Sequence, residues 1–225
     1  MNNINKLDNP VWHSLNEVHT GFCIEYNNLL CYKPDVCPFG GYIGDNSIGD
    51  GINKYSLLDA DFFVVGDKPL FSTNVKLRFE LVCVQMVIDT PINLDITETI
   101  VPLNNGYEDE LLKLVTMVMP GYYKPNTHLT GNYYGIFKDG ILVAAAGERM
   151  KMNGFTEVSA VVTHPNYTGN GYAKQLSTYV TNTIFSQEKI PFLHTGETNP
   201  ISIPLYHKLG YTVRRKISFW NFVKA

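Results

Sequence analysis

The feature that most constrains the fold of this chain is the stretch EVSAVVTHPNYTGNGYAKQL, residues 157–176. Its first part, residues 157–163, is rich in β-branched side chains and is typical of a buried strand. Pro165 ends this strand, because proline lacks the N–H of a strand ladder and disfavours helical geometry at His164. Beyond a short turn, apolar side chains recur at helical spacing at Ala173, Leu176, Val180 and Ile184. The stretch therefore predicts a strand, a turn and a helix in direct succession.

The turn, residues 168–173, carries Gly169 and Gly171. A glycine-rich turn before a helix exposes unpaired backbone N–H groups at the positive end of the helix dipole. Such a turn is a candidate site for a phosphate or pyrophosphate group. Short glycine patterns also occur in junctions that bind nothing, so the glycines alone leave both interpretations open.

Over a longer stretch the chain resembles the GNAT superfamily of N-acetyltransferases. The acyl-CoA-binding motif of that family has Arg or Gln, two residues, Gly, one residue, and then Gly or Ala. The residues at the six positions here are Thr168, Gly169, Asn170, Gly171, Tyr172 and Ala173. Thr168 departs from the motif, which leaves the backbone cradle intact but removes one side-chain contact to phosphate.

Other segments follow in the order of the family. Residues 199–211 resemble its closing motif, residues 191–194 the strand before that motif, and residues 134–148 the strands that open the sheet. The resemblance covers residues 105–225. It implies an α/β fold with a GNAT-like mixed central sheet flanked by helices, N-acetyltransferase activity, and acetyl-CoA as co-substrate.

We expect two domains. Residues 104–225 would form the catalytic domain, and residues 1–95 a smaller α/β half. The linker between them is rich in Pro, Asn and Thr. Residues 9–13 and 34–39 resemble the degenerate N-terminal half of a tandem-GNAT bacterial subgroup.

In both parts, local patterns predict individual elements. We expect helices at 107–119 and 204–209, and strands at 62–65, 79–87, 134–138, 141–148 and 192–195. A final hairpin is expected from strands 211–213 and 217–223 around residues 214–216. The cations Lys208, Arg214, Arg215 and Lys216 would then be either a solvated turn or a binding patch.

Composition limits the classes of partner. With 225 residues and 44% hydrophobic side chains, the chain has material for a proper core, and 17% charged residues argues against disorder. A net charge of −3 gives no general attraction to nucleic acid. No apolar run reaches the length of a membrane span or a signal sequence, so we expect a cytoplasmic protein without membrane partners. The four cysteines show no zinc spacing, and we expect reduced thiols and no metal.

Acetyl transfer to an amine requires a group that takes the proton of the amine, donors for the oxyanion, and a proton for the leaving thiolate. The resemblance makes Glu157 the first candidate for the base, and desolvation at the edge of an apolar strand would raise its proton affinity. An edge glutamate that pairs with a surface cation is the alternative. Glu148 is the second candidate. His164 and His194 are expected to be structural.

The resemblance also assigns the remaining roles. Tyr206 would be the general acid near the CoA sulfur, with ordinary packing as the alternative. Asn199 would bind pantetheine, cap the following helix, or do both. The oxyanion donor would be a backbone N–H of Val161, Val162 or Thr163.

The acceptor side is less defined. Tyr122, Tyr123, Tyr133 and Tyr134 flank the loop 120–131 and would line an acceptor pocket or belong to the core. We expect direct transfer of the acetyl group to a primary amine of a small molecule or amino acid in a ternary complex, since the second part contains no cysteine nucleophile. The alternative is a non-catalytic acyl-CoA-binding sensor or partner-binding module.

Overall fold

The computed structural model describes residues 3–225, whose strands form one 11-stranded mixed sheet. The strand order is β1-β2-β3-β4-β11-β5-β10-β9-β8-β7-β6. The strands are β1 (Cys23–Tyr26), β2 (Leu29–Tyr32), β3 (Phe39–Tyr42), β4 (Asp61–Val65), β5 (Val75–Val87), β6 (Val101–Pro102), β7 (Tyr133–Lys138), β8 (Ile141–Met152), β9 (Phe155–Thr163), β10 (Ile190–Gly196) and β11 (Thr212–Lys224). The α-helices are α1 (Pro10–Glu17), α2 (Gly49–Tyr55), α3 (Glu108–Val118), α4 (Tyr172–Ser186) and α5 (Ser202–Lys208), and short 3₁₀ turns include Ile4–Asp8.

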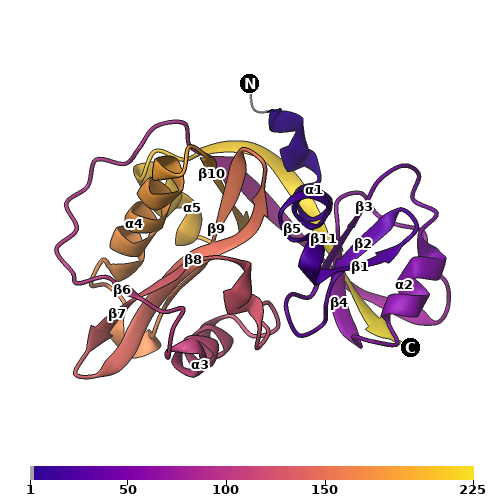
Figure 1. The fold of residues 1–225 in the computed structure, drawn as a ribbon, viewed down its shortest axis with the longest axis horizontal. Coiled ribbons are helices and arrows are strands. Elements are labelled where there is room, and N and C mark those ends of the chain that lie inside the picture. Colours follow the sequence, from indigo (N-terminus) through magenta and orange to yellow (C-terminus); the bar gives the residue numbers. More distant parts are fainter. Residues whose placement is uncertain (1–2) are drawn as a thin grey trace.

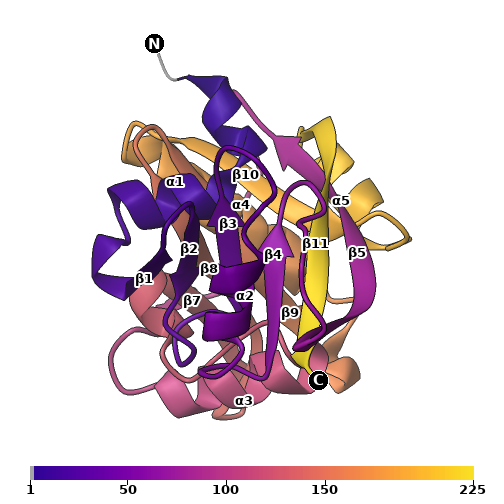
Figure 2. The same ribbon diagram turned by 90° about the vertical axis from the view of Figure 1, so that its right-hand side faces the viewer.

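The last strand joins the two halves of the sheet. β11 pairs antiparallel with β4 on one side and with β5 on the other, and β5 in turn pairs with β10. Figure 2 shows β2, β3, β4, β11 and β5 side by side. β5, which precedes the linker in sequence, therefore lies inside the sheet of the C-terminal part. The division into domains at 1–95 and 104–225 stays a prediction.

Helices cover both faces of the C-terminal part of the sheet (Figure 1). α4 packs on one face, where Leu176 and Val180 share a core with Val143 of β8. α3 packs on the opposite face, where Leu111 shares a core with Leu142, the next residue toward the start of the same strand. Neighbouring residues of a strand point to opposite faces, so the sheet is buried between the two helices.

The segment between β5 and β6 passes along α4 (Figure 1). The side chain of Asn182 bonds to both the N–H and the C=O of Ile92, at 2.8 and 3.0 Å. Oε1 of Gln175 accepts from the backbone N–H groups of Thr97 and Glu98. The predicted linker is therefore attached to the helix that follows the glycine turn.

The predicted helices at 107–119 and 204–209 are confirmed as α3 and α5, and each predicted interior strand lies within an observed one. The predicted C-terminal hairpin is wrong, because β11 is continuous from Thr212 to Lys224. A register shift between Val213 and Arg215 absorbs the polar run without a turn. β5 pairs with β11 along its whole length, and this hydrogen bonding keeps the polar residues 214–216 in the strand where their polarity predicted a turn.

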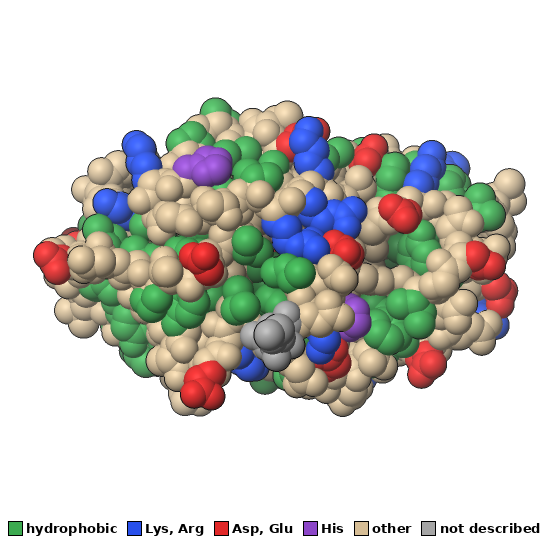
Figure 3. Space-filling model, turned by 90° about the horizontal axis from the view of Figure 1, so that it is seen from above, with side chains coloured by type: hydrophobic (Ala, Val, Ile, Leu, Met, Phe, Trp, Pro, Cys, Tyr) green, Lys and Arg blue, Asp and Glu red, His purple; other side chains and the backbone are tan. Residues whose placement is uncertain are grey.

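The cations of this run are paired rather than free. Asp8 binds Arg214 and Arg215, each at 2.7 Å, and Lys216 pairs with Glu197. Figure 3 shows Lys and Arg side chains grouped with acidic ones near the middle of the face seen from above. Two carboxylates against three cations offset most of the positive field that a binding patch would need. Within residues 3–225, no helix is both long and apolar enough to cross a membrane.

Candidate active site

A cavity of about 270 Å³ lies where β9 and β10 separate. The two strands run parallel, and their pairing stops at Glu157 and Phe192 although both strands continue. Residues from both diverging ends line the cavity, namely Glu157–Val161 on β9 and His194–Gly196 on β10. A separation between neighbouring strands leaves backbone groups free for a ligand that takes the place of a strand.

On the β9 side the cavity is lined by a bulge. Ala160 has a left-handed backbone with φ +51°, and the register with β8 shifts between Ala145 and Gly147. A bulge redirects backbone groups that would otherwise pair within the ladder. Of the three predicted oxyanion donors, Val161 lines the cavity, whereas Val162 lies in the core against α3 and Thr163 is not among the lining residues.

Glu157 lines the cavity and is fully engaged with the side chains of Arg149 and His194. Nε and Nη2 of Arg149 donate to its two carboxylate oxygens at 2.9 and 3.1 Å. Nδ1 of His194 lies 2.8 Å from Oε1. The side chain of Glu157 is 1% exposed, so this is a buried ion pair with a histidine attached.

The expected rise in the proton affinity of Glu157 is wrong. Burial by itself would raise its pKa, but the charge of Arg149 and the hydrogen bonds from His194 and Arg149 outweigh burial and lower the pKa to about 2. A carboxylate with so low a pKa is a weak general base at neutral pH. The geometry gives Glu157 a clear alternative role, which is to fix Arg149 and His194.

His194, expected to be structural, lines the cavity and is bonded at both ring nitrogens. Its Nε2 lies 3.0 Å from Nε2 of Gln85, and Gln85 also donates to the carbonyl of Leu7 at 2.7 Å. Because an amide nitrogen only donates, Nε2 of His194 accepts and Nδ1 carries the proton toward Glu157. Both ring nitrogens of His194 are therefore engaged, and none is open to an incoming amine. His164 lies outside the cavity and accepts from the N–H of Asn166 in the turn after β9.

Glu148, the second predicted base, does not reach the cavity. It is 0% exposed and pairs with Lys151 at 2.7 Å. Its oxygens also accept from Asn132 and Gln187. These contacts tie β8 to the loop before β7 and to the end of α4, which is a structural role.

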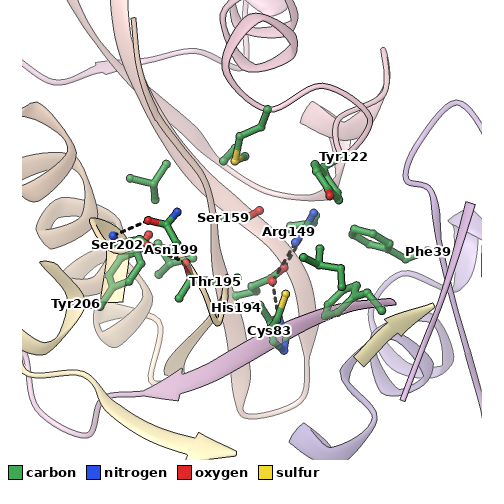
Figure 4. A pocket seen from close by; sticks show the side chains of 18 residues that line it. Phe39, Cys83, Tyr122, Arg149, Ser159, His194, Thr195, Asn199, Ser202 and Tyr206 are labelled. Atoms are coloured by element: carbon green, nitrogen blue, oxygen red, sulfur yellow. Dashed lines mark hydrogen bonds and ion pairs between the residues drawn. The ribbon is translucent and has the colours of Figure 1, made fainter. Parts of the chain in front are cut away.

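Tyr206, Asn199 and Ser202 lie together at one end of the cavity (Figure 4). Burial raises the pKa of Tyr206, so its hydroxyl stays protonated, and no hydrogen bond within residues 3–225 involves it. Oδ1 of Asn199 accepts from the N–H groups of Ile201 and Ser202, each at 3.0 Å. Asn199 therefore closes the turn before α5, whose N-cap is Ile201, and its role toward pantetheine stays a prediction.

The glycine turn follows β9 and leads into α4. Gly169 and Gly171 have φ of +85° and +75°, and both positions open to free space. α4 has 15 residues and no side-chain cap at its first turn. The first N–H groups of this helix are thus available to an anion. Open glycines and an uncapped helix fit a pyrophosphate group, whereas the side chain of Thr168 bonds to the carbonyl of Pro165.

The other end of the cavity is aromatic. Phe39 of β3, Tyr122 of the loop after α3 and Phe219 of β11 line it. Tyr123 and Tyr133 belong to the core against α3, so of the four candidate tyrosines only Tyr122 is a lining residue in the described part of the chain. The N-terminal half therefore contributes directly to the cavity through Phe39.

Cys83 of β5 also lines the cavity, although it lies outside the predicted catalytic domain. Cys83 lies at the cavity because its strand, β5, is hydrogen-bonded to β10 and β11. Burial raises the pKa of its thiol to about 12. A thiol held in its protonated form is a poor nucleophile, so the geometry does not favour a covalent acetyl-cysteine.

Comparisons with known proteins agree with this geometry. The family model described as FR47-like protein matches residues 133–220. A GNAT-family protein from Novosphingobium aromaticivorans is 29% identical, with a TM-score of 0.88 over 97% of this chain and 98% of the other. This chain has the GNAT fold.

Two further structures share the GNAT fold at lower identity. A GCN5-related N-acetyltransferase-like protein from Streptococcus suis is 15% identical, with a TM-score of 0.67 over 96% of this chain and 92% of its own. A GCN5-related N-acetyltransferase from Kribbella flavida is 14% identical, with a TM-score of 0.63 over 95% and 93%. No curated protein matches the chain in sequence. The predicted mixed central sheet flanked by helices is confirmed, and the GNAT matches support an acetyltransferase.

Proposed function

We propose that the protein transfers an acetyl group from acetyl-CoA to a primary amine of a small molecule by direct attack in a ternary complex. The observation that carries this proposal is the continuity of three features along one segment. The separation of β9 from β10, the bulge at Ala160 and the uncapped N-terminus of α4 follow one another within residues 157–172. Acetyl-CoA is an extended thioester with a pyrophosphate at its far end, so it would contact these three features in this order.

The groups that line the cavity would serve the successive steps of the reaction as follows. The bulge, with Ser159 and Val161, offers backbone N–H groups to the thioester oxygen, whose charge grows as the amine nitrogen bonds to the carbonyl carbon. The C–S bond then breaks, Tyr206 gives its proton to the departing thiolate, and water returns a proton to Tyr206. The proton of the attacking amine leaves to water, because Glu157 and His194 are occupied by each other and by Arg149 and Gln85.

We further propose that the N-terminal half, residues 1–95, is a degenerate copy of the fold retained for its contribution to the acceptor side. Its support is the position of Phe39 on the cavity and the contact of Gln85 with His194. Acetyl-CoA is then a substrate held mainly by residues of the part 104–225.

The test is calorimetric titration of acetyl-CoA into the Gly171→Glu variant. A carboxylate at this position would occupy the site of the pyrophosphate and repel it, so affinity should fall by at least about 100-fold. Gly140→Glu is the matched control, since Gly140 also has a left-handed backbone, φ +76°, and opens to free space in the β7–β8 turn. Equal affinity of the two variants for acetyl-CoA would refute the pyrophosphate site.

A further inference from the structure

The aromatic end of the cavity is rigid and well defined. The rings of Phe39 and Phe219 meet edge to face with centroids 5.4 Å apart. The ring of Tyr122 is stacked on Phe63 at 5.5 Å. Phe39 and Phe219 are 1% and 3% exposed, so their orientations are set by the core behind them. Phe39 and Phe219 therefore form an apolar wall, and the half-buried ring of Tyr122 is the more accessible one.

The cavity has no spare negative charge. Among the described residues that line it, the charged side chains are Arg149 and Glu157, and they are bonded to each other. A second positive charge of a ligand would find no free carboxylate there, and a ligand carboxylate would meet a guanidinium whose charge Glu157 already balances. Burying a charge without a partner is costly. The cavity therefore selects against polyamines and against amino acids in their zwitterionic form.

Arg149 offers an open polar contact near the aromatic end. Arg149 uses Nε and Nη2 for Glu157, while Nη1 takes part in no hydrogen bond or ion pair within residues 3–225. Part of its guanidinium points toward the side on which Tyr122 lies (Figure 4). The guanidinium also lies over the ring of Phe39, at 4.7 Å from the centroid. Because its charge is already balanced, its free N–H suits an uncharged oxygen.

Figure 4 places this end opposite Tyr206 and Asn199, with Ser159 and Arg149 between them. The thioester proposed above would approach from the Tyr206 end and its acceptor from the Tyr122 end. Resting on that proposed function, we propose that the acceptor is a primary amine with an aromatic or large apolar body and no second charge. An amide, hydroxyl or other uncharged oxygen on this body would accept from Arg149.

The direct test measures amine binding to the wild-type protein by calorimetry in the presence of CoA. Phenethylamine should bind roughly 10- to 100-fold more tightly than ethylamine, in line with burial of one aromatic ring. Phenylalanine amide should bind at least as well as phenethylamine. Phenylalanine has a carboxylate where its amide has an uncharged group, and it should bind at least about tenfold more weakly than the amide. Spermidine should also bind at least about tenfold more weakly than phenylalanine amide. If either of them equals the amide, the proposal is overturned.

One variant distinguishes the loss of an aromatic contact from an unspecific loss of amine binding. Tyr122→Ala should weaken phenethylamine binding about tenfold and leave ethylamine binding within about twofold. Tyr122 is half-buried on a loop, so its removal is less disruptive than that of Phe39. An equal loss for both amines, or no loss for either, contradicts the assigned acceptor end.

The same titrations distinguish the two proposals. If acetyl-CoA does not bind, the proposed function fails, and the amine series is then measured with the free protein, where the predicted ranking still applies. If acetyl-CoA binds but the amines do not show the predicted order of affinity, the proposed function stands and the proposed class of acceptor is wrong.

Discussion

The buried pair of Glu157 and Arg149 makes a quantitative prediction about stability. Replacing Glu157 by Gln keeps the shape of the side chain but leaves the guanidinium of Arg149 buried without a countercharge. The lowering of the Glu157 pKa from 4.5 to about 2 corresponds to about 3 kcal/mol, at 1.36 kcal/mol per pKa unit. As an independent guide, removing one partner of a buried ion pair usually lowers the free energy of unfolding by about 3–5 kcal/mol.

The sign of the pH dependence follows from the same lowered pKa. The contribution of Glu157 is complete above the unfolded pKa of 4.5 and is lost as the pH falls toward about 2. The difference in unfolding free energy between wild type and Glu157→Gln should therefore be about 3 kcal/mol at pH 7 and about half of that at pH 3. Stabilities of 5–15 kcal/mol are usual, so we expect the variant to remain folded.

The assay is urea unfolding followed by tryptophan fluorescence at several pH values from 3 to 7. Glu25→Gln is the control, because Glu25 is an exposed carboxylate on the edge strand β1, and it should change the unfolding free energy by less than about 0.5 kcal/mol. A loss below about 1 kcal/mol for Glu157→Gln at pH 7, or a loss that is the same at pH 3 and pH 7, would refute the reasoning.

Two further predictions concern a proposed acid and a second buried histidine. Tyr206→Phe should lower kcat by at least about tenfold while the Kd for acetyl-CoA, measured by calorimetry, stays within about twofold; unchanged turnover across pH would exclude Tyr206 as the acid. Burial lowers the pKa of His19 from 6.5 to about 4, although its Nε2 lies 3.0 Å from the carbonyl of Thr130. Stability should consequently fall as the pH drops from about 6.5 to 4, and His19→Gln should remove that part of the urea titration; a wild-type slope retained in the variant would assign it to other groups.

Sequence reasoning succeeded where the signal was local. The strand, turn and helix of residues 157–176 follow one another without interruption, so β-branched composition, Pro165 and the glycines were sufficient. Tyr206 and Asn199 were found because they belong to one short motif that folds as a turn and α5. Their placement in the cavity depends on little beyond that segment.

The partners of Glu157 could not be predicted in this way. Arg149 reaches it across the β8–β9 ladder, whose register shifts beyond Glu148, and His194 comes from 37 residues along the chain. Gln85 and Phe39 arrive through β5 and β3, which the sequence assigned to the other half. The left-handed backbone of Ala160 has no local signal either, since alanine rarely adopts it. Long-range pairing, rather than propensity, assembles this part of the site.

The position of β11 has a consequence for folding. β4 and β5 are neighbours of β11 and not of each other, so strands β1 to β4 share no ladder with the rest of the sheet until β11 has paired with both. Until then, β4 and β5 each present an open edge, which favours association with other chains. Phe219 is carried by β11 itself, and Phe39 on β3 is joined to β10 only through it. The cavity is therefore complete only when β11 is paired on both sides, and a chain in which β11 is unpaired has no acceptor end.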